Sequence, residues 1–135
     1  MLRSEIRTKF EAHDILSTPQ RLEVAEILLR KPQHMSADQI IEELRANGSN
    51  VSKATVYNSL NLFGERGLVK ECLVDPERRF YDSTTSPHHH FYNADTGELS
   101  DIPSGSIEVT GLPELPAGTR MEGAELIVRI RNSAE

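Results

Sequence analysis

The first half of the chain repeats apolar residues at helical spacing, and short polar breaks separate the repeats. Thr18-Pro19 is a typical helix start, and Ser36-Ala37-Asp38-Gln39 has the form of a capping box. Lys31-Pro32 and Asn47-Gly48 are typical helix ends. The pattern predicts helices over residues 4–13, 18–30, 36–47 and 52–64, the last with Val56, Leu60 and Phe63 on its buried face.

After Gly67 the period shortens towards two. Residues 68–74 and 78–82 are predicted to be strands joined by a turn at Asp75-Pro76-Glu77. Helices followed by a two-stranded hairpin are typical of a winged helix-turn-helix, here over residues 1–83. Residues 84–135 would form a second small domain, with short strands at 88–92, 98–102, 106–109 and 124–131 and a turn at Asp95-Thr96-Gly97.

Charge is distributed unevenly along the chain. The net charge of −6 disfavours nucleic acid, but residues 1–70 hold ten basic and nine acidic side chains, and residues 71–135 hold five and twelve. Phosphate contacts depend on local charge, so the first half can still face DNA. No apolar run approaches the roughly 20 residues of a membrane span, no export signal opens the chain, and the single Cys72 can form no internal disulfide. We therefore expect a cytoplasmic protein without membrane contact.

The helix predicted from Ser52 has the composition of a DNA-reading element. Such a helix needs one buried face and one face whose side chains reach base edges. The candidates for the groove are Lys53, Thr55, Tyr57, Asn58 and Asn61, and Arg78 and Arg79 in the hairpin suit phosphate or minor-groove contacts. An ordinary amphipathic helix with a solvated polar face has the same pattern, which leaves both interpretations open.

Three consecutive histidines in the second half suggest a metal site. On a strand, His88 and His90 point to one face and His89 to the other. Two such imidazoles need further ligands, and a polar surface loop would explain the same run. The candidate ligands within plausible reach are His34, Asp82, His88, His90 and Asp101. Their three nitrogens and two oxygens would suit divalent iron, manganese or zinc.

Several short motifs, in this order and spacing, resemble the ferric uptake regulator superfamily over nearly the whole chain. The resemblance implies an α+β fold, with an N-terminal winged helix-turn-helix domain followed by a small α/β dimerisation domain. It also implies a homodimeric repressor that binds a palindromic, AT-rich DNA duplex, and a regulatory metal held by the same five residues. The matching motifs are Thr18-Pro19-Gln20-Arg21, His34-Met35-Ser36-Ala37-Asp38, Ala54-Thr55-Val56-Tyr57, Gly67-Leu68-Val69, Tyr81-Asp82, His88-His89-His90 and Gly97-Glu98-Leu99-Ser100-Asp101. The DNA-contacting positions would be Arg21, Lys53, Thr55, Tyr57, Asn58 and Arg78.

The chain also departs from the superfamily. Most members hold a structural zinc on two Cys-x-x-Cys pairs, but Asn93 and Thr96 stand where the first pair would be, so a Cys₄ zinc is excluded. A second metal site of the superfamily would fall on His89 and Glu108. The arginine that usually follows the tyrosine is Asn58 here.

Two subgroups are most similar: iron response regulators, which sense haem or iron through a histidine triplet, and cysteine-poor peroxide regulators. Aspartate at 82 and 101 is the pattern of the peroxide branch, in which ferrous iron reacts with peroxide and a ligand histidine is oxidised. We expect a peroxide sensor with Fe²⁺ or Mn²⁺, which Zn²⁺ can replace in purified protein. The alternative is a haem-responsive regulator. A metal-dependent enzyme is least favoured, since two small domains leave little room for a substrate pocket.

Overall fold

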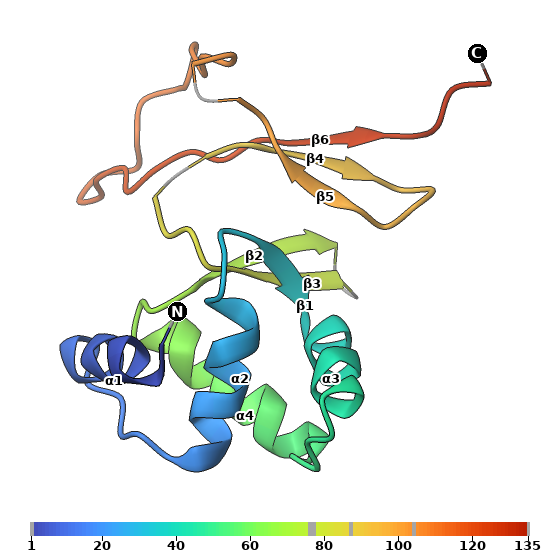
Figure 1. Ribbon diagram of the computed structural model, residues 1–135. Coiled ribbons are helices and arrows are strands. Elements are labelled where there is room, and N and C mark those ends of the chain that lie inside the picture. Colours follow the sequence, from blue (N-terminus) through green and yellow to red (C-terminus); the bar gives the residue numbers. More distant parts are fainter. Residues whose placement is uncertain (1, 76–77, 87, 104, 135) are drawn as a thin grey trace. The chain divides into compact units, whose positions relative to one another are not determined.

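A computed structural model describes residues 2–75, 78–86, 88–103 and 105–134, with Asp75 and Arg78 described by their backbone alone. The chain divides into two compact units, Met1–Thr85 and Ser86–Glu135 (Figure 1). The boundary expected from the sequence lay two residues earlier, after residue 83. Each unit is considered in turn.

Helices dominate the first unit. Each helix after the first begins at a side-chain cap: the Thr18 hydroxyl accepts from the Arg21 N–H at 3.2 Å, Ser36 and Gln39 form the expected capping box, and Ser52 caps the last helix. No helix in the described residues is long and apolar enough to cross a bilayer. The predicted helices are confirmed, with ends shifted by one or two residues. Their bounds are α1 Arg3–Ala12, α2 Pro19–Leu28, α3 Ala37–Ala46 and α4 Lys53–Glu65.

The helices enclose one hydrophobic core. Val56, Leu60 and Phe63, the predicted inner face of α4, are each 0% exposed. The Phe63 ring packs against Phe10 of α1, with 5.4 Å between the ring centroids. This burial fixes the orientation of α4, and its opposite face therefore carries the polar residues.

A small antiparallel sheet completes the first unit. It comprises β1 (His34–Ser36), β2 (Lys70–Asp75) and β3 (Arg78–Asp82), in the order β1-β3-β2 among the described residues. The β2–β3 hairpin confirms the predicted wing, whereas the predicted turn at 75–77 lies largely outside the described residues. β1 was not predicted, because three residues are too few to show alternation. Its register nevertheless sets His34 opposite Asp82.

The second unit is built on another three-stranded sheet, counted over its described residues. It comprises β4 (His90–Asn93), β5 (Leu99–Asp101) and β6 (Ile127–Ile130), in the order β5-β4-β6. The hairpin between β4 and β5 turns at the predicted position, and Gly97 has a positive φ of 75° there. β6 pairs with β4 in parallel, which the sequence did not indicate.

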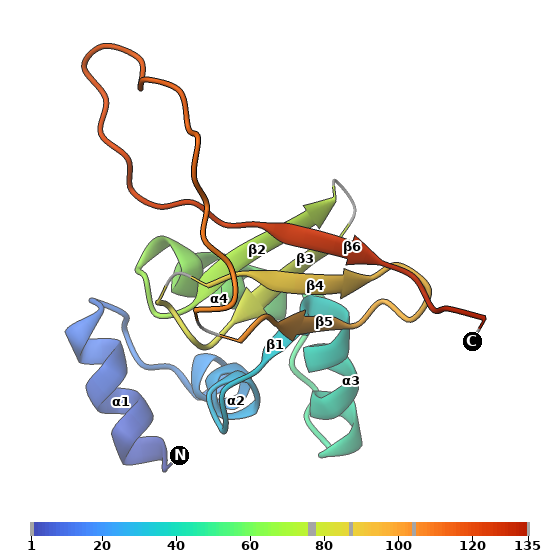
Figure 2. The ribbon, with the colours of Figure 1, turned by 90° about the horizontal axis from the view of Figure 1, so that it is seen from above.

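The strand predicted at residues 106–109 is wrong. The Ser106 N–H donates to the Pro103 carbonyl at 3.1 Å, and residues 106–109 pair with no strand of the described chain. Both sides of β4 are already occupied, by β5 and β6, so Ile107 and Val109 find no partner strand there. Figure 2 shows the segment between β5 and β6 as a long loop that leaves the sheet, and residues 108–123 are all exposed.

Candidate functional site

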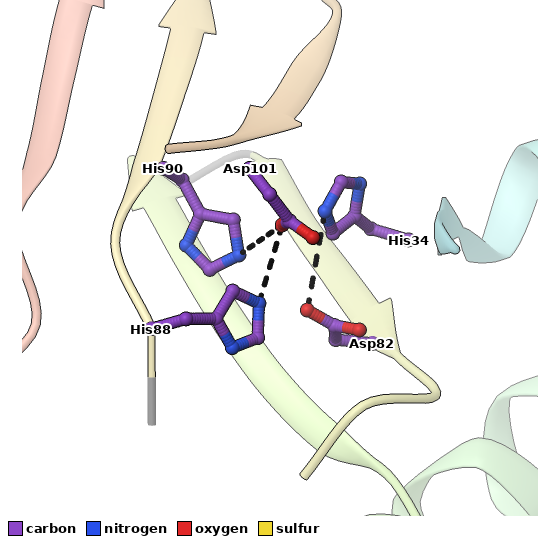
Figure 3. Close-up of side chains that lie close together, drawn as sticks. All are labelled: His34, Asp82, His88, His90 and Asp101. Atoms are coloured by element: carbon purple, nitrogen blue, oxygen red, sulfur yellow. Dashed lines mark ion pairs between the residues drawn. The ribbon is translucent and has the colours of Figure 1, made fainter. Parts of the chain in front are cut away.

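The register of β1 and β3 brings together the two candidate ligands of the first unit. His34 lies directly opposite Asp82, and its Nε2 is 3.9 Å from Asp82 Oδ2 (Figure 3). Asp82 is 2% exposed, and its other oxygen, Oδ1, accepts from the Thr84 N–H at 2.8 Å. The backbone thus holds one carboxylate oxygen and leaves the second facing the imidazole.

The other three candidates meet in the second unit. His90 lies opposite Asp101 in the β4–β5 register, and the His88 and His90 rings are 4.4 Å apart between centroids. One oxygen of Asp101, Oδ1, is 3.2 Å from His88 Nε2 and 3.4 Å from His90 Nε2 (Figure 3). His88 and His90 thus approach the same carboxylate, but β4 begins at His90, so His88 precedes the strand that was predicted over residues 88–92.

The His88 ring is oriented by the backbone. Its Nδ1 lies 2.7 Å from the Ser86 carbonyl oxygen, which can only accept, so Nδ1 carries the hydrogen. In the neutral ring, Nε2 then offers its lone pair on the side of Asp101. A histidine that donates one N–H to a carbonyl and presents the other nitrogen is the usual arrangement of a metal ligand.

The two groups have the chemistry of cation sites. In each, imidazole nitrogens face a carboxylate oxygen at 3.2 to 3.9 Å, and two lone pairs repel unless a positive charge lies between them. Each of the five side chains offers one nitrogen or oxygen donor. Such donors suit Fe²⁺, Mn²⁺ or Zn²⁺, so the residues fit the metal that the sequence predicts.

His89 has a different position in the second unit. Its Nδ1 accepts a hydrogen bond from the Leu126 N–H at 2.8 Å, and its carbonyl accepts from the Ile102 N–H at 2.9 Å. In the neutral ring, Nε2 then carries the hydrogen, and the only lone pair is used by the backbone. We therefore propose no metal site at His89 and Glu108. His89 instead links β4 to the segments that follow β5 and precede β6.

The outer face of α4 presents the residues predicted to read DNA. Lys53, Tyr57 and Asn58 are exposed, and Thr55 is half-buried. The Tyr57 hydroxyl donates to Asp38 Oδ1 at 3.4 Å. Partial burial, followed by the charge of Asp38, raises the pKa of Tyr57. Tyr57 is thus a neutral hydrogen-bonding group near physiological pH.

The two arginines predicted to contact DNA lie outside α4. Arg21 is half-buried at the start of α2, and its guanidinium donates to the Leu16 carbonyl at 2.7 Å, which closes the preceding loop. Arg78 begins β3, and its side chain lies outside the described part of the chain. Arg21 thus has a structural contact that the sequence did not indicate.

Cys72 is a core residue of β2. It is 5% exposed, and burial, followed by the charge of Asp82, raises the pKa of its thiol, against a smaller opposite effect of Lys70. Reactive cysteines are exposed and have lowered pKa values. Cys72 therefore does not have the properties of a peroxide-sensing thiol.

Backbone groups that orient the site and its neighbour His89 were not predicted from the sequence. These are the Thr84 N–H on Asp82, the Ser86 carbonyl on His88, and the Leu126 N–H that occupies His89. Every residue has a backbone carbonyl and, except for proline, a backbone N–H. No residue type therefore marks such contacts in the sequence. The nearest signal is the position of Thr84 and Ser86 between two candidate ligands.

A match to a family model identifies the family of this chain. Residues 13–127 match the family model described as the ferric uptake regulator family. The chain belongs to this family. A peroxide operon regulator of Bacillus subtilis is 39% identical over 85 residues, which is 63% of this chain and 59% of that protein. The chain thus spans less than two thirds of that relative's length.

Solved structures of the family show the same fold. The ferric uptake regulator of Vibrio cholerae has a TM-score of 0.75 at 23% identity, over 93% of this chain and 98% of that chain. The Pseudomonas aeruginosa ferric uptake regulator, solved with manganese, has a TM-score of 0.69 at 23% identity, over 93% and 96% of the two chains. The winged helix-turn-helix and the small second domain are thus the architecture of this family.

Proposed function

We propose that this chain is a metal-dependent, DNA-binding transcriptional repressor that senses peroxide through one divalent iron or manganese ion. The observation that carries the proposal is the pair of donor groups, each oriented by a backbone contact, on a chain of the ferric uptake regulator family. The name of the Bacillus subtilis relative, a peroxide operon regulator, supports peroxide as the signal. The proposed ligands are His34, Asp82, His88, His90 and Asp101.

Coordination number supports one shared ion. His34 and Asp82 offer two donors, too few to hold a divalent ion tightly. His88, His90 and Asp101 form a set of two histidines and one carboxylate, which alone would leave about half of a six-coordinate ion open. Together the five leave about one position. That is enough for a molecule the size of peroxide but too little for the bound substrate of an oxygenase.

A shared ion would act on the arrangement of the two units. His34 and Asp82 belong to the first unit, and the other three ligands to the second. With the ion bound, the five side chains hold the units in one arrangement; without it, that restraint is lost. Metal and DNA affinities are then reciprocally coupled, typically by 1–3 kcal/mol (about 5- to 150-fold).

We further propose that the second unit forms a homodimer and that α4 enters the major groove of a palindromic, AT-rich duplex. Among the described residues of the second unit, the buried hydrophobic residues are few, namely Tyr92, Leu99 and Ile102. A core that small is marginal alone and favours association. A two-fold dimer would present two copies of α4, which accounts for a palindromic site.

Peroxide would act at the metal ligands in this proposal. Cys72 is buried with a raised thiol pKa, so a thiolate is not available. The five proposed ligands would hold a ferrous ion that activates peroxide, so that one peroxide oxygen is added to a ligand imidazole and the other leaves as water. The ligand histidines are the nearest oxidisable groups, and an oxidised imidazole no longer offers the same lone pair, so the restraint on the units is lost.

The metal switch is tested by the affinity of the chain for an operator duplex, selected from random AT-rich palindromes in the presence of Mn²⁺. We expect Mn²⁺ to tighten binding by about 5- to 150-fold over chelator. His90→Ala, and Asp101→Asn at an exposed carboxylate, should abolish this difference, while His13→Gln should preserve it. Equal affinity with and without Mn²⁺, together with an unchanged His90→Ala protein, would refute the switch.

Peroxide sensing has its own test. After Fe²⁺ and peroxide, mass spectrometry should find one added oxygen on a peptide that contains a ligand histidine, and Mn²⁺ should give none. An unmodified protein that still releases DNA would contradict the mechanism. A Soret band on haem titration, lost when the histidine run is replaced, would favour a haem-responsive regulator instead.

A further inference from the structure

A cavity of about 480 Å³ lies within the first unit, lined entirely by residues of that unit. One wall is formed by Glu5 and Lys9 of α1 and by His13 directly after it, at four-residue spacing. The turn after α2, residues 29–32, forms a second wall, and residues 67–68 and 83–85 form the third. In Figures 1 and 2, α1 lies at one edge of the helical layer, beside α2.

The charge of the lining is predominantly positive. Lys9, Arg30 and Lys31 contribute three cations against the single carboxylate of Glu5. Two of these charges are engaged: Glu5 Oε1 accepts from the Leu2 N–H at 3.3 Å, and Arg30 pairs with a carboxylate of α3 at 2.8 Å. Within the described residues, the ammonium groups of Lys9 and Lys31 have no ion-pair partner. Lys9 and Lys31 are exposed, and together they leave the lining with a net positive charge that favours an anion.

The remaining lining is both apolar and hydrogen-bonding. Leu29 and Leu68 line the cavity but are only 8% and 5% exposed, so each presents a small apolar patch that the core holds in place. Ser83 is committed to structure, since its hydroxyl donates to the Lys31 carbonyl at 3.2 Å and accepts from the Gln33 N–H at 3.0 Å. Those bonds tie the turn that carries Lys31 to the wall that carries Thr84.

We propose that this cavity binds a small organic anion, namely a carboxylate on a compact apolar body. Lys9 and Lys31 would hold the carboxylate, and Leu29 and Leu68 would contact the apolar part. The volume lies within the range of about 300–1,000 Å³ that is typical of small-molecule sites. An inorganic anion would satisfy the charges but leave the apolar surface uncovered.

The cavity is also connected to the candidate metal ligands. Thr84 lines it, and the N–H of Thr84 donates to Asp82 Oδ1 at 2.8 Å. An anion that contacts Thr84 therefore acts on the group that orients Asp82. This coupling rests on the proposed function, whereas the binding of the anion does not.

Binding is tested by titrating the metal-free full chain, labelled with ¹⁵N, with benzoate and recording amide shifts. Its neutral isostere benzamide and inorganic phosphate, at equal ionic strength, are the matched probes. We expect saturable shifts at residues 29–32 and 83–85 with benzoate, at about millimolar Kd, because partly exposed ion pairs contribute little each. Benzamide and phosphate should both bind at least about fivefold more weakly.

Lys9→Gln and Lys31→Gln should each weaken benzoate about fivefold, and Arg7→Gln, on the same helix but outside the lining, should leave it unchanged. Shifts that grow linearly without saturation would mean an adventitious additive only. Equal binding of benzamide, equal binding of phosphate, or unchanged benzoate binding in both lysine variants would also overturn the proposal. The same shifts on addition of a DNA duplex, lost in the lysine variants, would assign the cavity to the DNA backbone instead.

The coupling between the cavity and the metal ligands is measured separately, as the affinity of the chain for Mn²⁺ with and without saturating benzoate. A change that disappears in Lys31→Gln supports it. If the chain binds benzoate but its Mn²⁺ affinity is unchanged, only the coupling is refuted. If the chain does not bind Mn²⁺ at all, the metal proposal is refuted and the benzoate result stands.

Discussion

Replacing one carboxylate in each unit tests whether the two donor groups share one ion. Asp82→Asn and Asp101→Asn are the variants of choice, because each keeps the shape of the side chain and removes its charge. In Asp82→Asn, the carbonyl oxygen of the new amide can still accept from the Thr84 N–H, so the local backbone is preserved. Asp101 is 56% exposed, so its replacement should cost little stability.

The expected magnitude follows from linkage. A ligand at 100 times its Kd stabilises the folded chain by about 2.7 kcal/mol, and one at its Kd by about 0.4 kcal/mol. If losing one ligand weakens Mn²⁺ binding about 100-fold, each variant loses about 2.3 kcal/mol of the stabilisation by metal. That loss corresponds to roughly 5–15 °C in melting temperature.

The assay combines thermal unfolding at fixed free Mn²⁺ with calorimetric stoichiometry. Glu114→Gln, at an exposed carboxylate of the loop between β5 and β6, is the matched control, and chelated samples correct for direct effects on folding. One ion per chain, bound about 100-fold more weakly in both variants, is the expected result. Two ions per chain, or an Asp82→Asn protein that retains the full metal response, would show that the groups bind separately and would refute the shared site.

Three further predictions concern DNA, the core and the thiol. Lys53 is exposed, and its proposed role is a phosphate contact. Lys53→Gln should therefore weaken operator binding for all sequences alike and reduce the salt slope by about one, as measured by fluorescence anisotropy against salt. Leu60→Ala, at a residue that is 0% exposed, should cost about 2–5 kcal/mol in urea denaturation, whereas Leu73→Ala, at 56% exposed, should change stability by less than about 0.5 kcal/mol. Iodoacetamide should modify Cys72 slowly at neutral pH and rapidly in denaturant, because burial raises the pKa of its thiol in the folded chain alone, and fast modification of the native protein would contradict this.

The helices could be predicted from the sequence because their signals are local. Thr18, Ser36 and Ser52 each cap the helix that follows, and the side-chain oxygen and the N–H that it accepts lie within three residues. β1 could not be predicted, because three residues become a strand only through pairing with β3. The parallel pairing of β6 with β4 depends on residues that are distant in the sequence, and alternation does not reveal which neighbour a strand takes.

The candidate site could also be predicted only in part from the sequence. Residue type and strand alternation could select His88 and His90 over His89, since successive side chains point to opposite faces. They could not indicate that the lone pair of His89 is used by the Leu126 N–H, because that contact joins residues brought together by the sheet. Hydrogen bonds to the backbone assign the tautomers of His88 and His89, and these hydrogen bonds cannot be predicted from the sequence.

The loop between β5 and β6 has a consequence for how this chain tolerates change. Parallel strands such as β4 and β6 require a long connection, which a helix often supplies, whereas here residues 108–123 are exposed throughout. The entropy of closing a flexible loop grows with the logarithm of its length, so doubling the loop costs only about 0.6 kcal/mol. Insertions and deletions within this connection should therefore leave the sheet and its histidines in place. The loop between β5 and β6 is thus the part of this chain whose length can vary most freely without loss of fold.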